Sequence, residues 1–218
     1  MQQDWHFPPE TRAFLAGLRD NNRKDWFEAH RADYQSAFLA PAGACGDLLS
    51  AELSRLAGRP YRARLFRIYR DQRFSRGVPY KAHLHMLFEE IAPQGFGPAL
   101  FFGLEPDGLF LGGGIFAFDA PALLRWRAEV AGPRGAELAD LLATQQASGA
   151  RLFEPELKAP PRGTPPDHPR AGLLRHKGLV LQSALQDGEL AEDRGFVGLC
   201  RAEFARLMPV IDWLRSAG

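Results

Sequence analysis

Cysteine is scarce in this sequence, and long apolar runs are missing. The 218 residues include only Cys45 and Cys200, too few for a disulfide framework or a four-cysteine zinc site. The longest stretch without charge, Ile91–Leu104, has 14 residues with two prolines and three glycines. A membrane-spanning helix needs about 20 mostly apolar residues. The first ten residues lack the basic and apolar regions of a secretory signal. We therefore expect a cytoplasmic protein with no membrane partner and with two buried free thiols.

Several motifs that mark known enzyme classes are also missing. The sequence contains no GxSxG, Walker A, HExxH or CxxC pattern, which argues against nucleophilic, nucleotide-cleaving and zinc enzymes that carry them. The run Gly112–Gly114 is not followed by a helix, as a phosphate-binding loop requires. It predicts a bulge or a close backbone contact within a strand.

Charge is nearly balanced overall but uneven along the chain. The net charge of +1 predicts no general affinity for polyanions, so nucleic acid is not an expected partner. Residues 59–85, however, carry eight cations against the single acid Asp71, a net charge of +7, which leaves −6 for the remainder. These cations are Arg59, Arg62, Arg64, Arg67, Arg70, Arg73, Arg76 and Lys81. A basic island in an acidic chain favours a focused site for a small anion.

The order of apolar patterns predicts an α+β fold with N-terminal helices, a central antiparallel sheet and C-terminal helices, in one domain over residues 1–218. Expected helices cover 11–22, a segment from Asn22 that Pro41 and Gly43 interrupt, 47–56, a segment after the capping residue Asp119, 134–147, a turn at 173–177, and 195–216. Expected strands cover 64–70, 83–88, a hairpin at 98–118 and 179–185. Residues 105–108 (Glu-Pro-Asp-Gly) match a tight turn within that hairpin. Six prolines exclude a regular element from 155–172.

The basic island supplies the first set of candidate site residues. Arginine and lysine side chains can neutralise a phosphate or a carboxylate, and hydroxyl groups can orient it. We expect Arg67, Arg70, Arg73 and Lys81 in the first role, and Ser75 and Tyr80 in the second. The alternative is an exposed edge strand whose charges prevent aggregation, with Asp71 neutralising one arginine.

Two histidines follow at strand spacing. His83 and His85 lie on one strand face, where they are candidate proton carriers in catalysis, together with His168 and Asp71. The same spacing would suit a metal if Asp71 or His168 supplied a third ligand, but we expect neither a metal nor a cofactor.

A second cationic stretch lies in the proline-rich region. Lys158, Arg162 and Lys177 accompany Asp167 and His168. Long ordered loops often cover sites, so we expect 155–172 to pack over the basic segment, with Arg162 and Lys177 contacting the anion. The alternative is a surface loop with incidental charge.

These residues favour a pocket for a phosphate- or carboxylate-bearing small molecule, with hydrolysis as one reaction class. Two alternatives stay open. One is a non-enzymatic nucleic-acid or protein-binding module, and the other is a metal-assisted hydrolase. The hypothesis assigns no substrate, no oligomeric state and no established enzymatic activity.

Five stretches together resemble a known family. Residues 21–30 are similar to the pattern NNxxxWFxxH, and four further stretches (67–75, 79–81, 112–114 and 158–169) extend the similarity along the chain. The sequence thereby resembles the DUF2461 family of bacterial and fungal proteins, whose function is uncharacterised. The resemblance implies a shared α+β fold and a shared site. Gly77 and Val78 stand where the family usually has Asp-Lys, which bears on how this member would bind a ligand.

Overall fold

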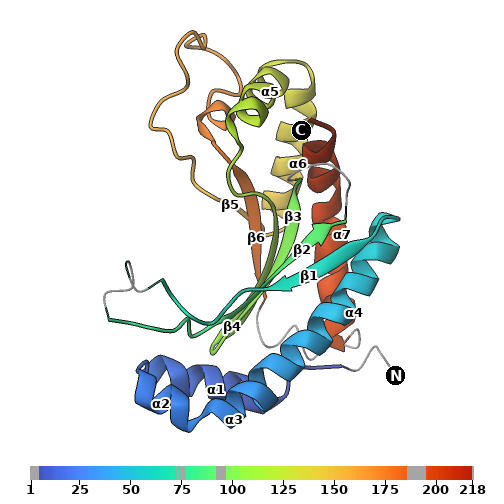
Figure 1. Cartoon of the computed structure of the whole chain (residues 1–218). Coiled ribbons are helices and arrows are strands. Elements are labelled where there is room, and N and C mark those ends of the chain that lie inside the picture. The colour runs from blue at the N-terminus through green and yellow to red at the C-terminus, as the bar shows by residue number, and fades with distance from the viewer. Residues whose placement is uncertain (1–4, 72, 74–76, 92–96, 186–194, 218) are drawn as a thin grey trace. The chain divides into compact units, whose positions relative to one another are not determined.

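The structure, a computed structural model, describes residues 5–71, 73, 77–91, 97–185 and 195–217 (Figure 1). The fold is α+β, as predicted. The helices are α1 (Pro9–Asp20), α2 (Lys24–Ala29), α3 (Arg31–Asp33), the π-helix η1 (Tyr34–Leu39), α4 (Ala40–Ala57), α5 (Ala120–Ala131), α6 (Arg134–Ala147), the 3₁₀ turn η2 (Leu173–Arg175) and α7 (Gly195–Ala217). The strands are β1 (Tyr61–Leu65), β2 (Leu84–Glu90), β3 (Ala99–Glu105), β4 (Gly108–Ile115), β5 (Arg151–Leu152) and β6 (Leu179–Leu185). Within the described residues they form one sheet in the order β1-β2-β3-β4-β6-β5.

The chain divides into two compact units. The first comprises residues 1–92, 101–111 and 184–202, and the second comprises 93–100, 112–183 and 203–218. The core of the first unit contains Phe27, Phe38, Leu49, Ile68, Phe88 and Phe102, all at most 1% exposed. The core of the second contains Trp126, Val130, Leu138, Ile211 and Trp213. The single domain over residues 1–218 stays a prediction.

The expected helix interruption at Pro41 and Gly43 is wrong. The π-helix η1 leads directly into α4, and Ala40 N donates to Gln35 O, five residues back. Pro41 lacks an N–H group, but it stands in the first turn of α4, the part of a helix that tolerates proline best. Gly58, with φ of +65°, ends α4 in the left-handed conformation that glycine tolerates best.

The expected strand at 64–70 is also wrong in its bounds. β1 covers Tyr61–Leu65 and pairs antiparallel with β2, from Tyr61 opposite Glu90 to Leu65 opposite Met86. The extent of a strand depends on its partner as well as on its own composition, and β2 begins only at Leu84. β1 lies beside α4 in this unit (Figure 1).

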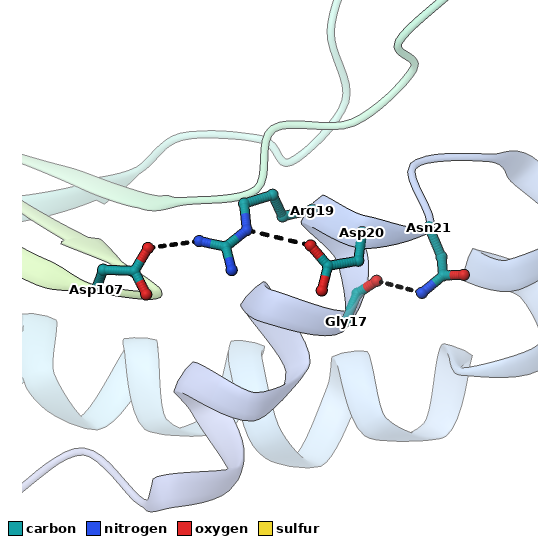
Figure 2. Close-up of polar contacts among 5 residues, drawn as sticks. All are labelled: Gly17, Arg19, Asp20, Asn21 and Asp107. Atoms are coloured by element: carbon teal, nitrogen blue, oxygen red, sulfur yellow. Dashed lines mark hydrogen bonds and ion pairs between the residues drawn. The ribbon is translucent and has the colours of Figure 1, made fainter.

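The predicted hairpin at 98–118 is confirmed as β3 and β4. Its turn is held by α1 of the same unit. Arg19 Nη1 donates to Asp107 Oδ2 at 2.5 Å and Arg19 Nε donates to Asp20 Oδ1 at 3.3 Å (Figure 2). These carboxylates raise the pKa of the Arg19 guanidinium. At the end of α1, Asn21 Nδ2 donates to Gly17 O at 3.0 Å, which satisfies a terminal helix carbonyl (Figure 2).

The second unit matches its predicted elements closely. Asp119 accepts a hydrogen bond from Ala122 N at 2.8 Å and caps α5 as expected. The bounds of α6 and β6 agree with the predicted 134–147 and 179–185. Residues 155–172 contain turns and bends but no regular element, as expected. The two-residue strand β5 was not predicted. None of the described helices has the length and apolar character needed to cross a membrane.

Candidate functional site

Residues 66–71, 73 and 77–82 make up what we call the arm, which lies between β1 and β2 and carries most of the predicted basic residues. In Figure 1 it is the long connection that leaves the ends of these two strands. Its two sides pair through the backbone: Arg70 N donates to Pro79 O at 2.8 Å, and Lys81 N donates to Ile68 O at 2.7 Å. This pairing fixes the two cationic residues on facing sides of one narrow ribbon.

The arm is anchored to the N-terminal helices through the backbone of Tyr80. The side-chain amide of Asn22 donates from Nδ2 to Tyr80 O at 3.0 Å and accepts from Tyr80 N at Oδ1, also at 3.0 Å. Arg70 Nε donates to the same carbonyl at 2.9 Å. The backbone N–H and C=O of Tyr80 thus both bind a side chain 58 residues away, and the C=O also accepts a charge-assisted bond from across the arm.

Aromatic rings complete this anchor. Phe27 is fully buried, and its ring stacks on Tyr80 at 4.3 Å, with Tyr34 at 5.1 Å and Tyr69 at 5.8 Å. Burial is the main cause that raises the pKa of Tyr34 and of Tyr80, and the neighbouring Tyr69 raises both further. Tyr80, predicted to orient a ligand through its hydroxyl, is only 4% exposed and packs within this ring cluster.

At the base of the arm, four residues form what we call the cationic cluster: Arg70, Lys81, His83 and His85. The two imidazole rings stack at 4.1 Å. Burial lowers the pKa of His83, and the charges of Arg70 and Lys81 lower it further. Burial also lowers the pKa of His85, to about 4, with contributions from His83 and Lys81. Burial and neighbouring positive charge thus act in the same direction on both imidazoles, and both favour the neutral form of the rings.

The remaining predicted residues of the arm are arranged differently. Asp71 binds Arg73: Arg73 Nη2 donates to Oδ2 at 2.6 Å and Arg73 Nε donates to Oδ1 at 3.0 Å. The expected neutralisation of one arginine by Asp71 is thus present, and each partner moves the other's pKa toward its charged form. Arg67 is exposed. Ser75 lies outside the described residues.

An aromatic surface adjoins the cationic cluster, and sequence analysis missed it. Phe66 N donates to His85 O at 2.9 Å, so these residues face each other across the β1–β2 ladder. The ring of Phe110 meets His85 edge to face at 5.0 Å. Gly103 in β3 makes room for this ring, because a Cβ there would lie 2.0 Å from Phe110 Cζ. The glycine inside an apolar strand was the available signal, since such glycines often mark a close approach.

The predicted residues of the proline-rich stretch belong to the second unit. Arg162 and Lys177 are exposed, and Lys177 N donates to Glu156 Oε2 at 2.6 Å. The packing of 155–172 over the basic segment stays a prediction, and so does the contact of Arg162 and Lys177 with an anion.

His168 and its neighbour Asp167 were expected to form a pair for acid–base chemistry. His168 Nδ1 instead accepts from Arg170 N at 3.0 Å, which places the proton of the neutral ring on Nε2. Arg170 itself donates to Val130 O at 2.6 Å and to Ala131 O at 2.9 Å. The loop is thereby tied to the last carbonyls of α5, an anchoring role that the sequence did not indicate.

Metal ligation gains no support from the arrangement of these side chains. Across the residues that the structure describes, no three histidine, cysteine, aspartate or glutamate side chains gather as a metal site requires. Asp71, one suggested third ligand for His83 and His85, is engaged by Arg73, and His168 belongs to the second unit. Cys45 and Cys200 are buried free thiols, as predicted.

Comparison with known proteins decides the family. The family described as conserved hypothetical protein, DUF2461, matches residues 10–213. The chain belongs to the DUF2461 family. A search among curated proteins finds no match to this sequence. The match spans the helices that anchor the arm, the arm itself and the proline-rich loop.

The DUF2461 motif residues near the N-terminus hold the arm in place. Asn22 and Phe27 both contact Tyr80, and Trp26 stacks on His30 at 3.9 Å. At the position where the resemblance led us to expect Asp-Lys, Gly77 adopts φ of +85°, which favours glycine, and Val78 is 41% exposed. This member therefore offers a tight backbone bend there in place of two charges.

The depressed pKa of His85 predicts a pH dependence of stability. The folded protein holds this ring neutral down to about pH 4, whereas the unfolded chain protonates it near the ordinary histidine pKa of 6.5. The unfolded state binds more protons in that window, so this group makes stability fall as pH falls from 6.5 to about 4. Histidine Cε1–H resonances, followed by NMR against pH, should show a midpoint near 4 for His85. The variant Lys81→Met should raise it, and a wild-type midpoint near 6.5 would contradict the burial described here.

Proposed function

We propose that this DUF2461 protein binds a small anionic molecule, through a phosphate or carboxylate group, at the cationic cluster. The supporting observation is that Arg70 and Lys81 lie close enough to two part-buried imidazoles to lower the pKa of His83. Arg70 is exposed and Lys81 is part-buried. Positive charges gathered beside part-buried rings are unfavourable unless an anion compensates them.

The groups of the cluster suit this role in different ways. Lys81 presents a compact ammonium group, and no carboxylate of the described residues forms an ion pair with it. Arg70 is positioned by its bond to Tyr80 O, so its charge is held at the base of the arm. Neutral imidazoles can donate one hydrogen bond each to the anion. The pKa of about 4 makes His85 a weak general base, so hydrolysis would fall to His83.

Titration calorimetry with inorganic phosphate, tripolyphosphate, succinate and citrate tests the proposal. We expect the wild type to bind at least one of them, and Lys81→Met to weaken that affinity by about 10-fold or more, because a charged hydrogen bond contributes about 1.5–3 kcal/mol. Methionine keeps the apolar stem that lies against Phe66, whose ring centroid is 5.7 Å from Lys81 Nζ.

Arg62→Met is the matched control. Arg62 is exposed on β1, outside the cluster, and its replacement removes the same charge from the same basic island. Its affinity for the anion should stay within about 2-fold of wild type. The proposal fails if the wild type binds none of these anions, or if both variants weaken binding equally.

A further inference from the structure

The aromatic surface beside the cationic cluster lies on the face of the β1–β2 ladder turned away from α4. In α4, a Cβ at Gly46 would lie 3.0 Å from Ala63 Cβ and 3.5 Å from Met86 Sδ, so these strand residues face the helix. Side chains alternate along a strand. His85 and its cross-strand partner Phe66 therefore point to the opposite face.

Phe66, His83, His85 and Phe110 make up this surface, which we call the ring platform. Phe66 is 36% exposed, and the other three rings are half-buried. Because Gly103 has no side chain, the ring of Phe110 occupies the space directly over the β3 backbone. The rings of His83, His85 and Phe110 are in contact, with centroids 4.1 and 5.0 Å apart, and Phe66 lies opposite His85 across the ladder.

Positive charge borders the platform on the side of the arm. Lys81 Nζ lies 5.7 Å and Arg64 Cζ 4.9 Å from the centre of the Phe66 ring. Arg64 is also paired with Glu89 at 3.3 Å, whereas Lys81 acts on both imidazoles. If a flat ring of a ligand lay on the platform, a charged group joined to that ring by a short linker would be within reach of Lys81.

One polar atom in the platform lacks a partner. His85 Nε2 is buried and has no hydrogen-bond partner among the described residues. A buried polar atom without a partner is costly, and each one calls for an explanation, a bound group among them. Because Nε2 bonds in the plane of its own ring, only a ligand atom at the edge of the imidazole can satisfy it. A ring with nitrogen or oxygen atoms that stacks on Phe66 beside His85 offers such an atom, whereas a hydrocarbon ring does not.

Resting on the proposed function, we infer that the anion bound here carries a heteroaromatic ring, which stacks on the ring platform while its phosphate contacts Lys81. Nucleoside monophosphates represent this class. Stacking of a base on an aromatic side chain typically contributes a factor of about 5 to 150 in affinity. The cationic cluster supplies affinity for phosphate, and the platform supplies the preference for a ring.

Calorimetry that separates ring from phosphate tests the inference. The probes are AMP, GMP, CMP and UMP, compared with ribose 5-phosphate, inorganic phosphate and adenosine. We expect at least one nucleotide to bind about 10-fold or more tightly than ribose 5-phosphate. In Phe66→Leu and Phe110→Leu this ratio should fall below about 3, while affinity for inorganic phosphate stays unchanged. Phe116→Leu, a ring that is 55% exposed in the second unit, should keep the wild-type ratio.

The possible results distinguish a failure of the ring preference from a failure of the proposed anion binding. Equal affinity for ribose 5-phosphate and the nucleotides would overturn the ring preference and leave anion binding intact. An unchanged ratio in both folded leucine variants would likewise remove the platform from recognition. If no phosphate-bearing compound binds, or if adenosine alone binds, the proposed function fails and the inference fails with it. Circular dichroism of each variant confirms that it is folded, and Phe66→Leu, at a half-exposed position, keeps the test valid if Phe110→Leu unfolds.

Discussion

Replacing Gly114 with alanine should lower the free energy of unfolding by about 3 kcal/mol or more, since backbone strain and overpacking each cost about 1–3 kcal/mol. Gly114 has φ of +143°, a conformation that side chains disfavour. A Cβ there would lie 1.9 Å from Leu179 O and 3.0 Å from Val180 Cα. These are backbone atoms of β6, which cannot move without disturbing the sheet. Chemical denaturation followed by tryptophan fluorescence and circular dichroism measures the loss.

Gly43→Ala is the matched control for this substitution. Gly43 lies within α4, and nothing lies within 4 Å of a Cβ built there. Alanine is the better helix former by about 1 kcal/mol, so this variant should equal or exceed the wild type in stability. A Gly114→Ala protein within 1 kcal/mol of wild type would show that β4 and β6 are not held as closely as described.

Replacing Phe27 with alanine should cost about 3–5 kcal/mol of stability, the usual range for deleting a buried aromatic side chain. Phe27 is fully buried and contacts Tyr34, Tyr69 and Tyr80. The cavity would also free the arm from its support on α2. We therefore expect weaker anion binding under conditions in which the variant is still folded, because Arg70 and Lys81 are positioned through that arm. Denaturation and calorimetry on the same preparation give both quantities.

Phe116→Ala removes the same side chain from a site that is 55% exposed, and it should change stability by less than about 1 kcal/mol. Two results would count against the assigned role of Phe27. One is a stability loss no larger than that of the control. The other is unaltered anion affinity in folded Phe27→Ala, which would mean that the ring cluster does not position the cationic cluster.

The N-terminal motif by which this chain resembles the DUF2461 family has a structural role. Asn22 binds both backbone polar groups of Tyr80, and Phe27 stacks on its ring. Trp26 O accepts a hydrogen bond from His30 Nδ1 at 2.8 Å. This bond holds the imidazole ring of His30 where it stacks on the Trp26 ring. These residues hold the arm, and the arm presents the groups that we propose bind the ligand. The residues of a family motif can therefore be those that position a binding site, as well as those that contact the ligand.

The sequence by itself determined those elements whose signals are local. The Glu-Pro-Asp-Gly turn predicted the β3–β4 hairpin, because proline and glycine fix the backbone angles of their own residues. Asp119 marked the start of α5, since a capping side chain bonds an amide only three residues away. The apolar spacing over 134–147 likewise defined α6.

Features that depend on contacts between residues far apart in the sequence became visible only in the tertiary structure. The end of β1 follows from its register with β2. Arg70 comes close to His83 because the two sides of the arm pair, with Arg70 N donating to Pro79 O. The ring platform exists because the space over Gly103 in β3 accommodates the ring of Phe110 in β4. This fit involves two strands, so the sequence of either strand alone does not predict it. Local patterns specify backbone angles over a few residues. The direction of a side chain and the identity of its neighbours depend instead on packing, because a close-packed interior permits only one arrangement of these side chains.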